Sequence, residues 1–147
     1  MTKTSKLSTV ARVLMGALLL FSGLNAFLHF MPMPPMSPAA GAFVGALAAT
    51  GYFLPMLKII EIGVGVLLVS GRFVPLALTI AAPILVEVVA FHATLAPEGL
   101  AVPVLLLAAE LYLAWTHRAA FASLLSAKMN SIGDKRSPAR PELATAA

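Results

Sequence analysis

The sequence contains no cysteine, and Asp, Glu, Lys and Arg together make up only 11% of its 147 residues. The missing thiols exclude disulfides, thiolate metal sites, iron–sulfur clusters and a sulfur nucleophile within this chain. Ten basic and six acidic side chains cannot cover the surface of a soluble domain of this size, in which about 25% of residues are usually charged. The scarcity of charge therefore excludes an ordinary soluble enzyme, and the high hydrophobicity excludes a disordered chain.

Hydrophobic residues take the place of the missing charges. They make up 60% of the sequence, and the mean hydropathy is +0.95. A helix needs about 20 mainly apolar residues to cross a bilayer core of ~30 Å. Four segments meet this requirement: residues 10–30, 52–70, 73–95 and 100–117. We therefore predict four membrane-spanning helices, and we expect the first to be retained because its apolar run is long for a signal peptide.

The basic residues predict the orientation of these helices. Three basic residues lie within the first twelve, Arg72 lies between the second and third segments, and five more follow the fourth segment. The loops that would face the other side carry a single charge, that of Glu98. Because cytoplasmic loops are enriched in Lys and Arg, both termini are predicted to be cytoplasmic. The net charge of +4 then fits a membrane surface, and we expect the lipid bilayer rather than nucleic acid as partner.

The predicted fold is all-α: an integral membrane four-helix bundle with a short extra helix in the first outer loop. Prolines exclude a helix over residues 31–38, and residues 39–50 form a helix too short to span a bilayer. Gly41, Gly45 and Ala49 would give this short helix a smooth face for close packing. It would be either a lid over a cavity or an interfacial helix that plugs the outer end of the bundle.

The chain divides into three predicted regions. Residues 1–9 form a cytoplasmic N-terminus, and residues 10–125 form the membrane domain. Residues 126–147 form a polar, Pro/Ala-rich cytoplasmic tail that we expect to be disordered.

Four ionisable residues fall near the middle of the predicted spans. Glu61, Glu87 and Glu110 lie near the midpoints of the second, third and fourth segments, and Lys58 lies one turn outward of Glu61. An ionisable group at the bilayer centre costs at least ~2.5–3.5 kcal/mol on insertion scales, so it usually faces a cavity or a partner. Lys58 and Glu61 are three residues apart on one helix face, which predicts an ion pair. Three acids around one lysine predict a shared, partly protonated cluster; the alternative is a structural pair that only fixes how the second span packs.

Three more polar residues lie in the outer half of the predicted bundle. Asn25 and His29 share a face of the first span, where they either line a cavity or make interhelical hydrogen bonds. His29 and His92 lie at matching depth and could clamp a b-type haem, but we expect hydrogen-bonded or interfacial histidines instead. No third ligand with metal spacing accompanies them, and no catalytic or nucleic-acid-binding motif occurs. The predicted ligand-binding candidates, with no catalytic residue and no metal among the predictions, are Lys58, Glu61, Glu87, His92, Glu110, Asn25 and His29.

Several short stretches together follow the pattern of a known family. They are SGLN at 22–25, GYFLPMLKIIE at 51–61, GRFVP at 71–75, VEVVAFH at 86–92, PEG at 97–99 and AELYLAW at 109–115. In this arrangement of helices, glycines and buried charges, the chain resembles the DoxX family of small four-span bacterial membrane proteins. The resemblance covers residues 10–125.

The resemblance implies a multi-pass protein of the bacterial cytoplasmic membrane that serves as an accessory or quinone-handling subunit of a membrane redox system. Such a chain is expected to be part of a quinone-coupled oxidoreductase rather than a complete enzyme, with redox partner subunits or a second copy of itself. Any sulfur chemistry of the kind linked to some relatives would lie on a partner, because this chain has no cysteine. A small proton-linked carrier and a non-catalytic structural or assembly subunit are the alternatives.

Overall fold

The structure, a computed structural model, describes residues 3–32 and 35–122. Within these two ranges every regular element is a helix and no strand occurs, so the predicted all-α class is confirmed. The elements are α1 (Lys3–Leu28), α2 (Pro38–Ala49), α3 (Phe53–Ser70), α4 (Val74–Leu95), the 3₁₀ helix η1 (Pro97–Gly99), α5 (Ala101–Thr116) and α6 (Arg118–Phe121). The tail predicted over residues 126–147 lies outside the described residues.

Three helices of the described chain are long and apolar enough to cross a membrane. Their apolar stretches are Lys6–Leu28, Phe53–Ser70 and Val74–Leu95, in α1, α3 and α4. α5 is apolar but has only 16 residues, which is about 24 Å at ~1.5 Å per residue. This length falls short of a ~30 Å hydrocarbon core. The structure thus supports a membrane protein, while a fourth crossing by α5 stays a prediction.

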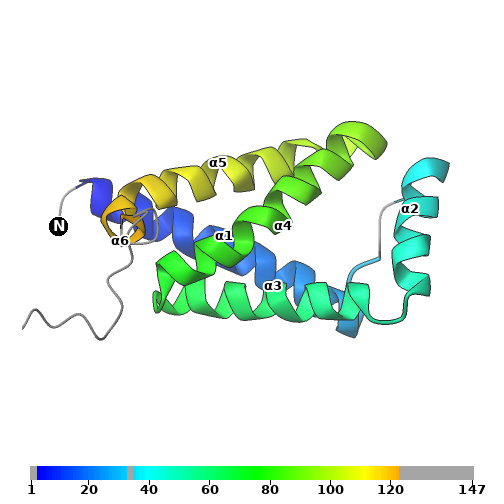
Figure 1. Cartoon of the computed structure of the whole chain (residues 1–147), viewed down its shortest axis with the longest axis horizontal. Coiled ribbons are helices and arrows are strands. Elements are labelled where there is room, and N and C mark those ends of the chain that lie inside the picture. Colours follow the sequence, from blue (N-terminus) through cyan, green and yellow to red (C-terminus); the bar gives the residue numbers. More distant parts are fainter. Residues whose placement is uncertain (1–2, 33–34, 123–147) are drawn as a thin grey trace, which may run out of the picture.

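The four longer apolar helices lie side by side, and α2 stands across one end of them (Figure 1). α1 packs most extensively against α3, and α4 packs against α5. Contacts of α1 with α5 and of α3 with α4 complete the arrangement, and α2 touches α3 and α4. The short turn after Gly71 brings the beginning of α4 next to the end of α3. Figure 1 shows the α3–α4 turn and α6 at one end of the molecule and α2 at the other.

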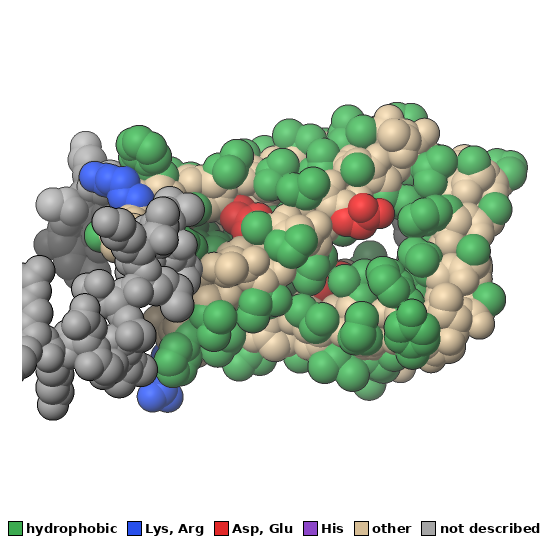
Figure 2. Space-filling model, viewed as in Figure 1, with side chains coloured by type: hydrophobic (Ala, Val, Ile, Leu, Met, Phe, Trp, Pro, Cys, Tyr) green, Lys and Arg blue, Asp and Glu red, His purple; other side chains and the backbone are tan. Residues whose placement is uncertain are grey.

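The core sits where these helices meet and consists of an apolar cluster, and Glu61 and Glu110 are the charged residues buried in the described chain. The members of the cluster are Met15, Leu19, Val64, Leu68, Val74, Ala77, Leu78, Ala81, Leu85 and Leu113. Large apolar side chains also cover the outer surface of the molecule (Figure 2). An outer surface of this kind is unfavourable in water and suits hydrocarbon, which agrees with the low charge of the sequence.

Glycines let α1 and α3 approach each other closely. A Cβ atom built on Gly65 would lie 2.8 Å from the carbonyl oxygen of Gly16 and 2.9 Å from the backbone nitrogen of Leu20. A Cβ atom on Gly16 would lie 2.9 Å from that of Leu68. These distances are below van der Waals contact, so larger residues at either glycine would push the helices apart. The contact is of the small-residue type that drives helix association in membranes.

Arg12 of α1 forms hydrogen bonds to the end of α3, next to the α3–α4 turn. Gly71 ends α3 with a φ of +72°, a left-handed conformation that favours glycine. The guanidinium group of Arg12 donates hydrogen bonds to the carbonyls of Leu68 and Val69, the last turn of α3. It also lies over Gly71, where a Cβ atom would come within 2.8 Å of Nη1. A cation at this position offsets the negative end of the helix dipole.

The expected close packing of α2 through its glycines is not made within the described chain. A Cβ atom on Gly41 or Gly45 would meet no atom within 4 Å. Ala40 is the buried residue of α2 instead, with 0% of its surface exposed. Ser37 begins the helix: its hydroxyl accepts from the N–H of Ala40 and donates to the carbonyl of Leu95 at 2.8 Å. α2 is therefore held by its first turn against the end of α4.

Candidate functional site

The predicted ion pair between Lys58 and Glu61 is present in the first half of α3. The Nζ atom of Lys58 donates to both carboxylate oxygens of Glu61, at 2.9 Å each. The Glu61 side chain is only 5% exposed, whereas the Lys58 side chain is 24% exposed. Nζ also donates to the hydroxyl oxygen of Ser22, on α1, at 3.1 Å. The pair is thus buried on its acidic side and open on its basic side.

Gly23 explains how Ser22 reaches the lysine. A Cβ atom on Gly23 would lie 3.0 Å from the carbonyl oxygen of Lys58 and 2.6 Å from a side-chain atom of Ile62. The missing side chain lets this turn of α1 rest against the backbone of α3. The neighbouring hydroxyl is thereby brought within hydrogen-bond distance of the ammonium group.

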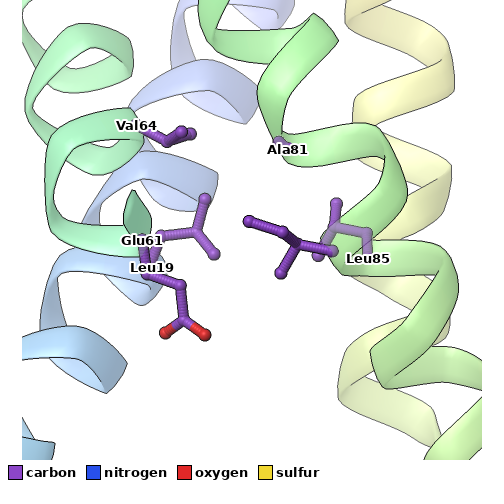
Figure 3. A pocket seen from close by; sticks show the side chains of 6 residues that line it. Leu19, Glu61, Val64, Ala81 and Leu85 are labelled. Carbon is purple, nitrogen blue, oxygen red and sulfur yellow. The ribbon is translucent and has the colours of Figure 1, made fainter. Parts of the chain in front are cut away.

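An apolar cleft lies next to the pair, on the side that faces the α3–α4 turn. It is lined by Leu19 of α1, Glu61 and Val64 of α3, and Ala81, Ile84 and Leu85 of α4. Figure 3 shows the Glu61 carboxylate at one edge of this cleft, with its oxygens directed away from Val64. The cleft is too narrow to admit a water-sized sphere. Water therefore does not reach the carboxylate through the cleft.

Polar residues lie one helical turn beyond this lining on all three helices, toward the end of the molecule that carries α2. Ser22 follows Leu19 by three residues, Lys58 precedes Glu61 by three, and Glu87 follows Ile84 by three. Residues three apart are neighbours on a helix surface, so these side chains lie one turn beyond the lining of the cleft on their helices. Lys58 and Glu87 also lie equally far along their helices from the α3–α4 turn, about 20 Å at ~1.5 Å per residue. We call Ser22, Lys58, Glu61 and Glu87 the polar rim.

Glu87 and Ser22 are the exposed members of the rim, whereas Lys58 is half-buried and Glu61 is buried. Figure 2 shows an opening between α4, α3 and α2, with an acidic side chain over α4 at its margin. In the described part of the chain the one ion pair is that of Lys58 and Glu61, so Glu87 has no cation there. Glu87 is thus the member of the rim with unused capacity to accept hydrogen bonds.

Glu110 lies apart from the rim. It is only 3% exposed, and neither of its carboxylate oxygens has a hydrogen-bond partner among the described residues. It sits in the second half of α5, toward the end of the molecule that carries α6. Of the three acids expected to surround Lys58, the structure joins Glu61 to it and does not join Glu87 or Glu110 by a hydrogen bond or ion pair.

Asn25 and His29 have a local structural role at the end of α1. The Asn25 amide donates to the carbonyl of Met31 at 3.2 Å, and its oxygen accepts from the N–H of Met31 at 2.7 Å. The N–H of His29 donates to the carbonyl of Asn25 at 2.9 Å, and His29 has a φ of +51°. These bonds turn the chain out of the helix, so Asn25 is used within its own segment rather than across the bundle.

His92 is engaged on both edges of its ring. Its Nδ1 atom lies 2.8 Å from the carbonyl oxygen of Val88, one turn back in α4. Its Cδ2 edge packs against Gly99 of η1, where a Cβ atom would lie only 2.7 Å away. The ring also stacks edge-on against Phe91. Among the described residues no group of three or more His, Cys, Asp or Glu side chains is placed to hold a metal ion.

Sequence reasoning missed Ser22 and the glycines that position it. Gly16 and Gly23 are seven residues apart, so they share a face of α1, and both meet α3 closely. This spacing is a recognisable signal for helix contact in a membrane. Ser22 carries no such signal, because its partner lies 36 residues away in the sequence.

Comparison with known proteins gave no match: no family model, no curated protein and no solved structure is similar enough to this chain to indicate kinship. The resemblance to the DoxX family therefore rests on the sequence stretches quoted above.

Proposed function

We propose that this chain is a four-span protein of the bacterial cytoplasmic membrane with both termini in the cytoplasm. Basic side chains gather at the end formed by α6 and the α3–α4 turn (Figure 2), as expected of a cytoplasmic face. α5 packs against α1 and α4, and its flanking elements η1 and α6 lengthen it at both ends. In this arrangement α5 completes a four-helix bundle, and α2 is the extra helix that lies at the outer membrane interface.

We further propose that the polar rim binds a quinone, and that the chain is an accessory or quinone-handling subunit of a membrane redox system. The observation that carries this proposal is a polar rim directly above a narrow apolar cleft, in helices that suit lipid. A quinone is an apolar ring with two opposed carbonyl groups, and it supplies two-electron, two-proton chemistry when bound. The DoxX resemblance supports the same class of function.

The residues of the rim match the two ends of such a ring. Lys58 uses its donors on Glu61 and Ser22, so the Ser22 hydroxyl keeps its own proton for a ligand carbonyl. The adjacent ammonium group strengthens that hydroxyl as a donor. On α4, Glu87 accepts a hydrogen bond when ionised and holds a proton when neutral. The electrons come from a partner subunit, so the chain is a part of an oxidoreductase rather than a complete enzyme.

Quinone binding by the purified protein tests this proposal. Ser22→Ala removes one hydrogen bond to the ligand, worth about 1.4 kcal/mol, and should weaken binding about tenfold. Ser70→Ala is the matched control, because that hydroxyl donates to the carbonyl of Leu67 at the other end of α3. Isothermal titration in lipid nanodiscs measures both. Absence of binding to the unmodified protein, or equal binding by the two variants, would contradict the proposal.

A proton-linked carrier is the second candidate, and Glu110 is the observation that favours it. A carboxyl group that is 3% exposed and lacks a hydrogen-bond partner among the described residues is suited to take up and release a proton during transport. Proton flux through proteoliposomes should then stop in Glu110→Gln and persist in Glu98→Gln, whose residue lies exposed in η1. Flux that is equal in both variants would remove this candidate.

A further inference from the structure

One face of α5 carries a row of exposed side chains that ends in a cation at the first residue of α6. Successive members of the row are three or four residues apart, so they are neighbours on one face. In chain order they are Val104, Ala108, Leu111, Trp115 and Arg118. Leu111 is 63% exposed and Trp115 is 69% exposed, so the row faces the surroundings of the protein rather than its core. We call this row the α5 stripe.

Trp115 and Arg118 contact each other at the end of the stripe. The guanidinium carbon of Arg118 lies 5.2 Å from the centre of the Trp115 ring, which is a cation–π contact. Nη1 of Arg118 also donates a hydrogen bond to the carbonyl oxygen of Trp115 at 3.2 Å. In the described part of the chain, Arg118 has no acidic partner. The guanidinium group is therefore held beside the ring with most of its N–H donors available.

The end of the molecule around this contact carries cations and, among the described residues, no exposed acid. Figure 1 shows the start of α1, the α3–α4 turn and α6 at this end. Lys6, Arg72 and Arg118, in these three segments, are all exposed. Glu110 is the acid nearest to this end and is only 3% exposed, and the other described acids lie toward the end that carries α2. This end of the protein therefore attracts anions.

We infer that the α5 stripe binds an anionic phospholipid, with its acyl chains along Leu111 and its phosphate at Arg118. A tryptophan ring is favourable at the level between hydrocarbon and head groups, which is its place in this row. The planar guanidinium group donates to two oxygens of one phosphate. A zwitterionic head group also carries an ammonium charge, which the cations of this end repel. Charge therefore selects the anionic lipid, at a site separate from the polar rim.

The fluorescence of Trp115 tests this site alone, because the chain has no other tryptophan. Lipids with brominated acyl chains quench tryptophan fluorescence on contact. The full chain is placed in phosphatidylcholine vesicles that contain either brominated phosphatidylglycerol or brominated phosphatidylcholine with the same chains. Quenching then gives the relative binding constant of the two lipids at Trp115. One cation at a membrane surface favours an anionic lipid about fivefold, so we expect a preference of about this size for phosphatidylglycerol.

Two variants that remove the same charge distinguish a site from a general charge effect. Arg118→Gln should abolish the preference, because it removes the phosphate-binding group beside Trp115. Arg72→Gln is the matched control: its side chain is also exposed at this end, but in the α3–α4 turn, and the preference should persist. Absence of a preference in the unmodified protein would overturn the inference. A preference that survives in Arg118→Gln, or that falls equally in both variants, would also overturn it.

Discussion

Glu61 and Glu110 are the two buried carboxylic acids of the described chain, yet their surroundings differ. Glu61 receives two hydrogen bonds from Lys58, and Glu110 receives none from the described residues. A buried ion is costly unless it is paired, so the two groups place different demands on the fold. Glu61 depends on its lysine, whereas Glu110 is best accommodated as the neutral acid.

Breaking the Lys58–Glu61 pair should show this dependence. Lys58→Met leaves Glu61 buried without its cation and should lower the free energy of unfolding by about 3 kcal/mol. Adding Glu61→Met should restore most of that loss, because both charges are then replaced by apolar side chains. Denaturation in mixed micelles measures the three proteins. A double variant no more stable than Lys58→Met would show that the pair does not stabilise the fold.

The same double variant separates a functional pair from a structural one. If it folds and still binds quinone as tightly as the unmodified protein, the pair only fixes how α3 packs. We expect a loss of at least tenfold, because Ser22 then lacks the ammonium group that strengthens its hydroxyl.

The sequence could not predict which ionisable side chains on different helices lie close together. The three-residue spacing was enough to predict the Lys58–Glu61 pair, because both residues lie on one helix. Whether residues on different helices meet depends on how each helix is rotated about its axis. Each successive residue of a helix rotates the direction of the side chain by about 100°. The rotation of α4 leaves Glu87 exposed, and Glu110 is buried in α5 without a hydrogen bond to the lysine. The similar positions of these acids along their helices therefore suggested one cluster around Lys58, whereas the structure joins only Glu61 to that lysine.

At the scale of helices, hydropathy predicted the positions well. The predicted segments 52–70 and 73–95 correspond to helices Phe53–Ser70 and Val74–Leu95. The first helix begins earlier than predicted, at Lys3, because its first turns are polar and hydropathy marks only the apolar run. Which glycines make contacts was harder to predict. Gly41 and Gly45 of α2 face open space, whereas Gly16, Gly23 and Gly65 lie in the close contact between α1 and α3.

The contact between α1 and α3 gives a prediction with a matched control on the same helix. Gly65→Ala places a Cβ atom 2.8 Å from the carbonyl oxygen of Gly16, and the backbone there cannot rotate away. We expect a loss of about 2 kcal/mol in unfolding free energy, as in other overpacked contacts. Gly63→Ala meets open space and should be neutral or slightly stabilising, because alanine favours the helix. Equal stability of the two variants, measured by thermal denaturation in detergent, would be inconsistent with the close contact.

At the scale of the whole molecule, the account depends on α5 crossing the membrane. The chain lacks cysteine, so a single introduced cysteine is a unique label site. A membrane-impermeant maleimide should label Glu98→Cys in intact cells and label Ala119→Cys only after the cells are permeabilised. The two positions flank α5 and are both exposed. Labelling of both positions from the same side would show that α5 does not cross, and the four-span arrangement would be wrong.

The most direct test of the central claim is to locate the ligand on the chain. A photoactivatable azidoquinone should attach, on illumination in nanodiscs, to peptides of α1, α3 and α4 that contain the polar rim. An excess of unlabelled quinone should prevent the attachment, and Ser22→Ala should reduce it. Attachment that is confined to other helices, or that unlabelled quinone does not reduce, would contradict a quinone site at Ser22, Lys58 and Glu87.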